Sequence, residues 1–253
     1  MKILPREQWV GIVSNCENNI RIEECYNYGN ITGSVVSGIA VNGNYINKCI
    51  NFGKITGSRH AGGIFGDYSS RGNIYNCYNV GDIYNTGGYA GGISTQSENV
   101  INCYNTGRIE SSLTGGITAY GSVLNCFNSG NINSTGSGPT SGISAQGSSA
   151  ENCYNIGDAK GDVAAGIMGM GNSQRIYKCF NAGNITAKTA PTGGILGVGY
   201  GATCTECYNT GNVANETPDL LGEIAPVSFG TTVNCAFLQK ETNAPANGAT
   251  PKS

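Results

Sequence analysis

Cysteine recurs at a nearly constant spacing along most of the chain, and this feature limits the possible folds more than any other. Successive members of the series are 24, 28, 26, 23, 27, 26, 28 and 28 residues apart, an average of about 26. A repeat of this length indicates stacked units, each of which contacts only its neighbours. The series is Cys25, Cys49, Cys77, Cys103, Cys126, Cys153, Cys179, Cys207 and Cys235.

The residues around each cysteine repeat as well. In the first eight units a glycine stands four residues after the cysteine, and a small apolar residue stands six after it. A second signature, Gly-Ile, occurs between cysteines, for example at Gly63-Ile64 and Gly166-Ile167. An asparagine stands two residues after the cysteine in the same eight units, at Asn27, Asn51, Asn79, Asn105, Asn128, Asn155, Asn181 and Asn209.

These units predict an all-β fold, a right-handed parallel β-helix of about nine coils. No unit has the roughly 10–12 residues of helical periodicity that a helix needs. Asparagine and glycine tolerate a left-handed backbone, so we expect a sharp corner at Asn-x-Gly. A 26-residue unit reaches at most ~86 Å, enough for one three-sided coil, and nine coils would stack over about 40 Å. Parallel crossovers favour the right hand. The alternative, a β-propeller, needs blades of about 40 or more residues.

The repeats divide the chain into three parts. Residues 1–10, which include the only tryptophan, Trp9, are expected to cover the first coil. Residues 11–238 form the predicted β-helix. Residues 239–253 are rich in Ala, Pro, Thr and Asn and are expected to be a flexible linker or tail.

Charge and composition exclude several classes of function. Lys plus Arg number 14 against 16 Asp plus Glu, for a net charge of −2. We therefore expect no nucleic-acid partner, because nothing favours counterion release. No apolar run is long enough to insert into a membrane or to act as a secretory signal. The single histidine, His60, makes a Ser-His-Asp triad or a histidine metal site a poor hypothesis, and we expect it to be solvated.

Two segments of the repeat resemble a known family. Residues 74–83 (IYNCYNVGDI) and 62–66 (GGIFG) are similar to the GLUG-motif repeats of large bacterial surface proteins, including regions that flank IgA-cleaving metallopeptidases. The resemblance covers about residues 10–238 and departs at 91–94 and 115–118, where the closing glycine is missing. It implies a surface-exposed or secreted stalk or adhesive module. The peptidase activity is not implied, because one histidine cannot form H-E-x-x-H.

The repeated side chains favour structural roles. In-register coils would stack the cysteines as buried free thiols, although neighbouring thiols would also lie within disulfide range. Cys204 is expected to pack inward beside Cys207, whereas Cys16 is either a loop thiol or a partner of Cys25. The asparagines are expected to form a buried amide ladder. The aromatic residue after most cysteines, such as Tyr78, favours a packing ladder over a sugar-binding column.

No catalytic, cofactor or metal site is predicted. The five aspartates fall in different units, and no pair of carboxylates suggests a glycosidase. The leading hypothesis is a rigid, non-enzymatic module of an extracellular or cell-surface protein that acts as a stalk, an adhesin or a binding surface. Its partner would be a glycan or a cell-surface protein. The candidate contact residues lie in the variable loops and are Tyr45, Tyr68, Tyr120 and Tyr200.

Two other functions stay open at this point. Parallel β-helices include polysaccharide lyases and glycosidases, so the chain could be a glycan-active enzyme with a shallow groove. Alternatively, the open strand edges at the two ends of a β-helix could pair with other copies and build a fibre.

Overall fold

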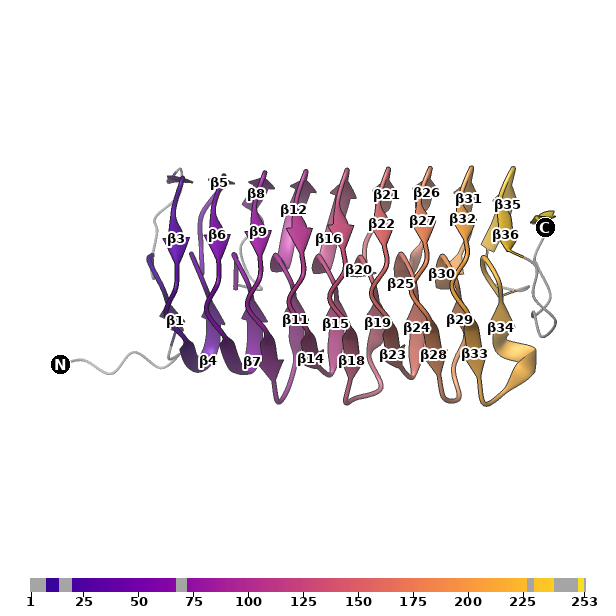
Figure 1. The fold of residues 1–253 in the computed structure, drawn as a ribbon, viewed down its shortest axis with the longest axis horizontal. Helices are drawn as coiled ribbons and strands as arrows, with labels where there is room; N and C mark the ends of the chain where they lie inside the picture. Colours follow the sequence, from indigo (N-terminus) through magenta and orange to yellow (C-terminus); the bar gives the residue numbers. More distant parts are fainter. Residues whose placement is uncertain (1–7, 14–19, 67–71, 227–229, 239–249, 253) are drawn as a thin grey trace.

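The computed structural model describes residues 8–13, 20–66, 72–226, 230–238 and 250–252. Within these ranges the chain is almost entirely β-structure, and the strands pair in parallel in all three sheets. Strands one repeat apart in sequence lie side by side, so the chain winds around one long axis as a solenoid (Figure 1). The predicted parallel β-helix is confirmed.

Three sheets run along the whole solenoid. Sheet A contains β1 (Gln8–Val10), β4 (Ile31–Ser37), β7 (Ile55–Gly62), β10 (Ile83–Asn85), β11 (Tyr89–Gly91), β14 (Ile109–Ser111), β15 (Leu113–Gly115), β18 (Ile132–Ser134), β19 (Pro139–Ser141), β23 (Ala159–Gly161), β24 (Val163–Ala165), β28 (Ile185–Ala187), β29 (Thr192–Gly193), β33 (Val213–Asn215) and β34 (Leu221–Gly222). A short 3-10 helix, η1 (Pro218–Leu220), precedes β34.

The other two sheets complete each turn. Sheet B contains β2 (Arg21–Glu23), β5 (Tyr45–Asn47), β8 (Gly72–Tyr75), β12 (Ser94–Ile101), β16 (Thr118–Leu124), β20 (Ser144–Gln146), β21 (Ser149–Glu151), β25 (Met168–Asn172), β26 (Arg175–Tyr177), β30 (Leu196–Tyr200), β31 (Ala202–Thr205) and β35 (Gly230–Val233). Sheet C contains β3 (Tyr26–Asn27), β6 (Ile50–Asn51), β9 (Tyr78–Asn79), β13 (Tyr104–Asn105), β17 (Phe127–Asn128), β22 (Tyr154–Asn155), β27 (Phe180–Asn181), β32 (Tyr208–Asn209), β36 (Ala236–Leu238) and β37 (Thr250–Lys252).

The register of sheet C follows the sequence repeat. Each strand from β3 to β36 begins directly after a cysteine of the series. Equivalent residues pair across turns, as Asn79 does with Asn51 and with Asn105. Nine such strands enclose eight full turns, close to the nine coils that the sequence predicts.

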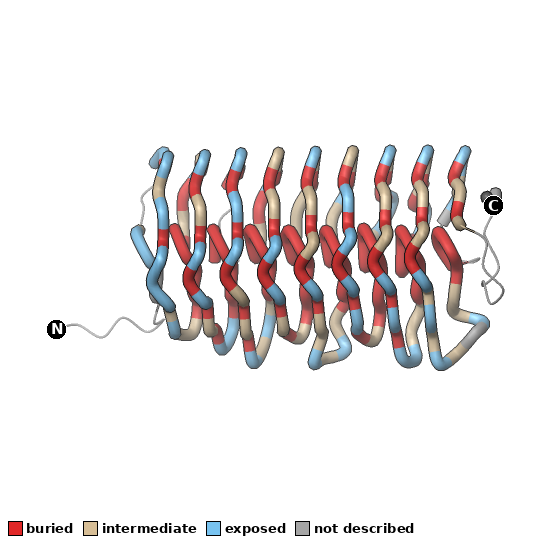
Figure 2. The backbone as a smooth tube through the Cα atoms, in the orientation of Figure 1, coloured by how far each residue is buried: buried red, intermediate tan, exposed pale blue. Residues whose placement is uncertain are grey.

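Two narrow apolar clusters fill the interior. The larger one contains the Ile of each Gly-Ile signature, such as Ile93, together with ladder cysteines such as Cys103. The second lies between the two halves of sheet A and includes Ile83 and Ala90. Figure 2 shows buried residues along the inside of every turn and exposed residues at its outer corners. Each unit contributes only a few small apolar side chains, so burial depends on the turns above and below.

The left-handed corner lies elsewhere than predicted. Among the described residues, no glycine of Asn-x-Gly has a positive φ. The left-handed residue is the one directly before the cysteine, such as Asn102 with φ of 55° and Lys178 with φ of 52°. It turns the chain from a sheet B strand into a sheet C strand. Asparagine is common there because its short polar side chain tolerates this conformation.

Both glycine signatures are explained by close approach between turns. A Cβ on Gly107, four residues after Cys103, would lie 2.2 Å from the carbonyl oxygen of Gly81 in the preceding turn. A Cβ on Gly92, the glycine of Gly-Ile, would lie 2.5 Å from Cγ of Asn105. The repeat therefore needs glycine for space at these positions.

Both ends add strands to the stack. β1 pairs with β4, with Trp9 opposite Val36, so residues 8–10 continue sheet A. At the other end, β37 pairs with β36, although the sequence predicts a linker there. Its pairing covers the edge of β36, which would otherwise be open. Phe237, on β36, is buried and belongs to the larger apolar cluster.

The described residues form no helix that is long and apolar enough to cross a membrane.

Candidate functional site

A large open groove runs along sheet B and is here called the corner groove. It has a volume of about 890 Å³, within the range of ligand-binding sites. Five consecutive levels of the stack contribute to it: β12, β16, β20, β25 and β30. At the spacing of parallel strands these levels span on the order of 19 Å along the axis.

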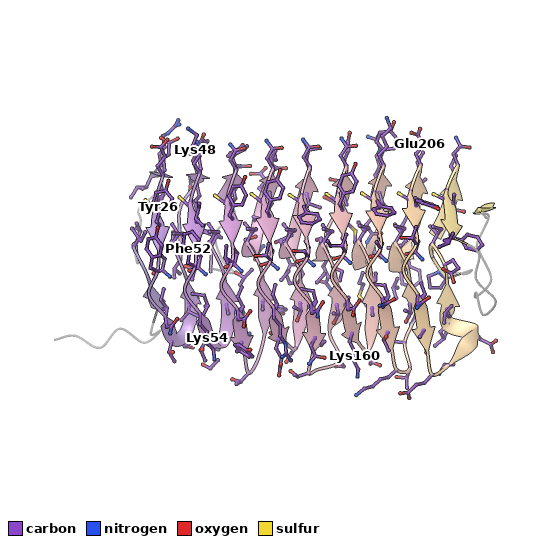
Figure 3. All side chains as sticks on the ribbon, in the orientation of Figure 1. Tyr26, Lys48, Phe52, Lys54, Lys160 and Glu206 are labelled. Atoms are coloured by element: carbon purple, nitrogen blue, oxygen red, sulfur yellow. The ribbon has the colours of Figure 1, made fainter. Side chains whose placement is uncertain are left out.

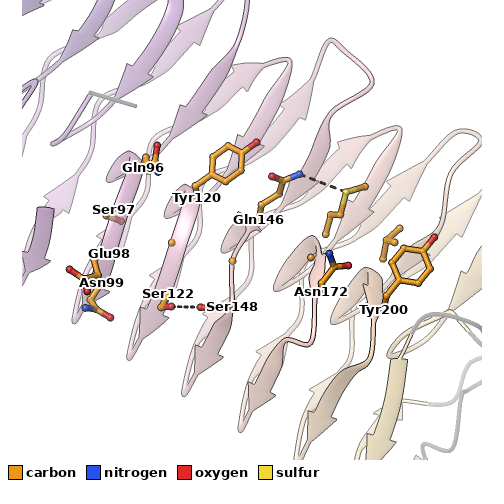
Figure 4. A pocket seen from close by; sticks show the side chains of 15 residues that line it. Gln96, Ser97, Glu98, Asn99, Tyr120, Ser122, Gln146, Ser148, Asn172 and Tyr200 are labelled. Carbon is orange, nitrogen blue, oxygen red and sulfur yellow. Dashed lines mark hydrogen bonds between the residues drawn. The ribbon is translucent and has the colours of Figure 1, made fainter. Parts of the chain in front are cut away.

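Two rows of side chains line the corner groove, with a row of small residues between them (Figure 4). The first row follows the register of the sheet and consists of Gln96, Tyr120, Gln146, Met170 and Val198. The second row consists of Asn99, Ser122, Ser148, Asn172 and Tyr200. Between the rows lie Ser97, Gly121, Gly147 and Gly171.

Glycine creates the depth of the groove, because it places no side chain on the floor. Gly121 has φ of 154°, which other residues rarely adopt. The hydrogen-bond ladder between turns is also interrupted at this point. β16 pairs with β20 through Tyr120 and Gln146, and pairing resumes only at Val123 and Ala150 in β21.

Buried hydroxyl groups support the floor from inside. Thr118 Oγ1 donates a hydrogen bond of 2.9 Å to the carbonyl oxygen of Tyr120. Ser144 Oγ lies 3.1 Å from the carbonyl oxygen of Gln146 and 3.2 Å from that of Gly121. These contacts fix the backbone beneath the first row, so the groove is preformed.

The polar side chains of the groove are hydroxyls and amides. Ser122 and Ser148 share a hydrogen bond of 2.8 Å between their Oγ atoms, and Gln146 Nε2 lies 3.7 Å from Sδ of Met170. Tyr200 is 63% exposed at one end of the groove. Among the described residues of the lining, Glu98 is the only charged one. The groove thus offers hydrogen-bond donors and acceptors, tyrosine surface and a single carboxylate.

An aromatic cluster holds Tyr120 in place. Its ring packs edge-on against Tyr89, with 5.2 Å between centroids, and Tyr89 stacks on His60 at the same separation. The prediction that His60 is solvated is wrong, because this side chain is 9% exposed. The histidine faces a ring in the next turn, a contact that the local sequence does not reveal.

The four predicted tyrosines have different surroundings. Tyr120 and Tyr200 come together in the corner groove. Tyr45 lies on β5, outside the groove, where it contacts Tyr75 and the guanidinium of Arg21. Tyr68 lies outside the described residues.

The aromatic column after the cysteines faces outward from sheet C. Tyr78 and Tyr104 stack with 4.9 Å between centroids and 10° between planes, and Phe180 and Tyr208 stack at 5.7 Å. Two other pairs of the column, Tyr104–Phe127 and Tyr154–Phe180, are tilted or edge-on at 6.3 Å. The rings therefore pack on one another from turn to turn, as a packing ladder on the surface.

The asparagine ladder is confirmed and continuous. Nδ2 of each asparagine donates to Oδ1 of the next, with distances of 2.7–2.8 Å from Asn27 to Asn209. The second proton of Nδ2 goes to a backbone carbonyl in the same turn, as from Asn105 to Gly107 at 2.9 Å. Every one of these side chains is buried, which is consistent with a structural role.

The cysteines form a second buried column, and all ten described cysteines are free thiols. Burial raises the pKa of the Cys77, Cys126 and Cys204 thiols, so these groups stay protonated and unreactive at neutral pH. Cys204 packs inward as predicted. Cys16 lies outside the described residues. Within the described ranges, no group of three or more His, Cys, Asp or Glu could hold a metal ion.

Sequence reasoning missed most of the groove, including Gln96, Glu98, Gln146 and Asn172. A signal was present, because a small residue stands four positions after the Ile of Gly-Ile in each of the five units that build the groove. These residues are Ser97, Gly121, Gly147, Gly171 and Gly199.

Comparisons with protein-family models, with curated proteins and with solved structures found no match. The resemblance to GLUG-motif repeats therefore stays a prediction.

Proposed function

We propose that this chain is a rigid, non-catalytic module that binds a linear polysaccharide along the corner groove. The observation that carries the proposal is the run of amide, hydroxyl and tyrosine side chains over five levels of the stack. Sugars present hydroxyl groups that donate and accept hydrogen bonds, together with C–H faces that pack on aromatic rings. An extended chain lying parallel to the axis would contact at least one polar or tyrosine side chain at each level.

Binding without cleavage fits the charge of the groove. Glycoside hydrolysis normally requires two carboxyl groups placed on either side of the bond. Glu98 is the only carboxylate among the described lining residues, so the second group has no counterpart among them. These residues also include no lysine or arginine, which argues against a nucleic-acid backbone as ligand.

The solenoid would serve as a rigid support for this groove in a bacterial surface or secreted protein. Support for that location comes from the resemblance of residues 62–66 and 74–83 to repeats of such proteins. Stacked turns hold the groove straight, since each level is bonded to two neighbours.

The proposal predicts retarded migration of the protein in native gels that contain a soluble polysaccharide. A panel of hydroxyethyl cellulose, dextran, xylan and galactomannan would be used, and we expect at least one to bind. Tyr200→Ala should weaken that binding roughly fivefold, because a tyrosine face contributes about 1 kcal/mol. Gln146→Ala should also weaken binding, through the loss of an amide in the first row.

Tyr45→Ala is the matched control. It removes a tyrosine from sheet B outside the groove and should leave the affinity unchanged. Failure of all four polysaccharides to bind, or equal effects of the Tyr45 and Tyr200 variants, would contradict the proposal. Release of new reducing ends during incubation would favour an enzyme instead.

A further inference from the structure

We infer that the corner groove selects polysaccharides without negative charge, and that Glu98 is the residue that sets this selectivity. The inference rests on the proposed function and names the class of ligand. Glu98 is the single ionised side chain among the fifteen that line the groove. It makes no ion pair with any residue that the structure describes.

A bulge in β12 places Glu98 at the groove. Ser97 pairs with Gly72 and Asn99 pairs with Asn73, so Glu98 is an extra residue with no partner on β8. The register with β16 shifts at the same point, between Gln96 and Asn99. A bulge of this kind redirects a side chain, and bulges are common next to functional sites. Glu98 is exposed there.

A neighbour of Glu98 strengthens the preference for ligand groups that donate hydrogen bonds. Asn99 Nδ2 already donates to Asn73 Oδ1 at 2.8 Å, which uses a donor of that side chain. This end of the groove is therefore rich in acceptors. Hydroxyl or ammonium groups of a sugar would donate hydrogen bonds to these acceptors, and carboxylate or sulfate groups would be repelled.

The expected selectivity is modest, because Glu98 is exposed to solvent. One exposed charge pair changes an affinity by roughly fivefold at most, and salt screens it. A neutral polymer should therefore bind roughly fivefold more tightly than its anionic derivative at low ionic strength.

The test compares polymers that share a backbone. Hydroxyethyl cellulose would be paired with carboxymethyl cellulose, and dextran with dextran sulfate, and affinities would be measured in native gels at low salt. For a pair that binds, we expect the neutral member to bind more tightly to the wild type. Glu98→Gln should raise the affinity for the anionic member roughly fivefold, so that the ratio between the affinities of the two members falls to about one. One molar salt should remove the difference in the wild type.

Glu110→Gln is the matched control for net charge. Glu110 lies on β14 of sheet A, where it pairs with Arg108 at 2.9 Å, so the variant changes the same charge away from the groove. Three results would overturn the selectivity while leaving the proposed function intact. They are equal affinities for both members, tighter binding of the anionic member, or the same gain in affinity with Glu110→Gln. Absence of binding to every neutral polymer would instead contradict the proposed function itself.

Discussion

Glycine four residues after each ladder cysteine marks the closest approach between successive turns. A Cβ on Gly107 would lie 2.2 Å from the carbonyl oxygen of Gly81 and 2.7 Å from its carbonyl carbon. Both contacts are with backbone, which cannot rotate away. The first member of this series, Gly29, has no described strand of sheet C before it, and the nearest described neighbour of its Cβ would be Asn27 Oδ1 at 3.7 Å.

Gly107→Ala should therefore destabilise the protein by about 1–3 kcal/mol, the usual cost of forcing atoms into a packed site. Gly29→Ala makes the same change at the same motif position, and its effect should stay within about 0.5 kcal/mol. Urea unfolding followed by circular dichroism would measure both free energies of unfolding. Equal effects of the two variants would show that the glycine is needed for a reason other than contact between turns.

Sequence alone could not show what the short polar residue that stands five positions after most ladder cysteines contacts. The side chains of Asp82 and Asp158 accept hydrogen bonds from the backbone N–H of Arg108 and Asn184, one turn further on, at 2.9 and 2.8 Å. Asn and Asp both supply this short acceptor, and two turns have Lys54 and Arg108 at the position instead. Sequence displays the residue type at each turn but not the backbone group that it contacts.

At the scale of the element, the asparagine ladder has a direction. Every Nδ2 points toward the C-terminal end, and the last one, on Asn209, donates to Oε2 of Glu223 at 3.0 Å. Glu223 occupies the place of the glycine in Gly-Ile, one turn beyond Gly194, and is 3% exposed. The ninth unit has Phe237 where the others have asparagine. The glutamate supplies the acceptor that a ninth asparagine would have provided.

Removing that acceptor should destabilise the last turns. Glu223→Ala leaves an N–H of buried Asn209 without its partner, so we expect a loss of about 1–3 kcal/mol. Glu223→Gln retains an amide oxygen in the same position and should cost less. Glu216→Ala, a nearby exposed glutamate, is the control and should be close to neutral. Urea unfolding midpoints would rank the variants, and equal losses for Glu223→Gln and Glu223→Ala would contradict a hydrogen-bonded cap.

A second asparagine ladder runs in the opposite direction on the outside of the corner. Asn102 and Asn125 each donate to the preceding turn, at 3.2 and 3.1 Å. Nearby on sheet B, Asn47 Nδ2 lies 3.3 Å from Oε1 of Glu23. Each ladder of amide donors thus runs toward an end of the solenoid where a glutamate accepts a hydrogen bond from an asparagine.

The strands and ladders could be predicted because they depend on spacing alone. Cys, Asn and Gly at fixed offsets indicate which residues lie above one another, and the structure confirms those columns. The bulge at Glu98 could not be predicted, since it arises from a mismatch between β12 and the two adjacent strands. The pairing of β37 with β36 was also missed, because its three residues carry no repeat signal.

At the scale of the whole molecule, the corner groove exists only because five turns are in register. Its first row contains residues more than 100 positions apart in sequence, from Gln96 to Val198. Sequence analysis found two of its tyrosines, since exposed aromatic residues in variable loops are recognisable. It did not find the amides, because glutamine and asparagine are common in loops and nothing in one unit indicates which of them share a surface.

Some of the charges on the outer surface form ion pairs between turns. Lys48 pairs with Glu24 at 3.1 Å, and Lys178 pairs with Glu206 at 3.8 Å, and all four side chains are exposed. Figure 3 shows Lys48 and Glu206 at the outer corner of the turns. Such pairs contribute little stability each. They limit repulsion between stacked turns, whereas Glu98 is the only charge among the described residues of the groove.

The measurement that most directly tests the assembly of one groove from stacked turns is the polysaccharide affinity of two unit-deletion variants. Deleting residues 127–153 joins Cys126 to Tyr154 and removes the level of Gln146 and Ser148 from the groove. Deleting residues 26–49 joins Cys25 to Ile50 and removes a whole unit outside it. Each deletion preserves the repeat, so both variants should keep a β-sheet circular dichroism spectrum.

We predict that the variant lacking residues 26–49 binds the best neutral polysaccharide of the panel with wild-type affinity. The variant lacking residues 127–153 should bind it roughly tenfold more weakly, since one level contributes on the order of 1 kcal/mol through its polar contacts. Equal affinities for the two variants would contradict a groove built from consecutive turns.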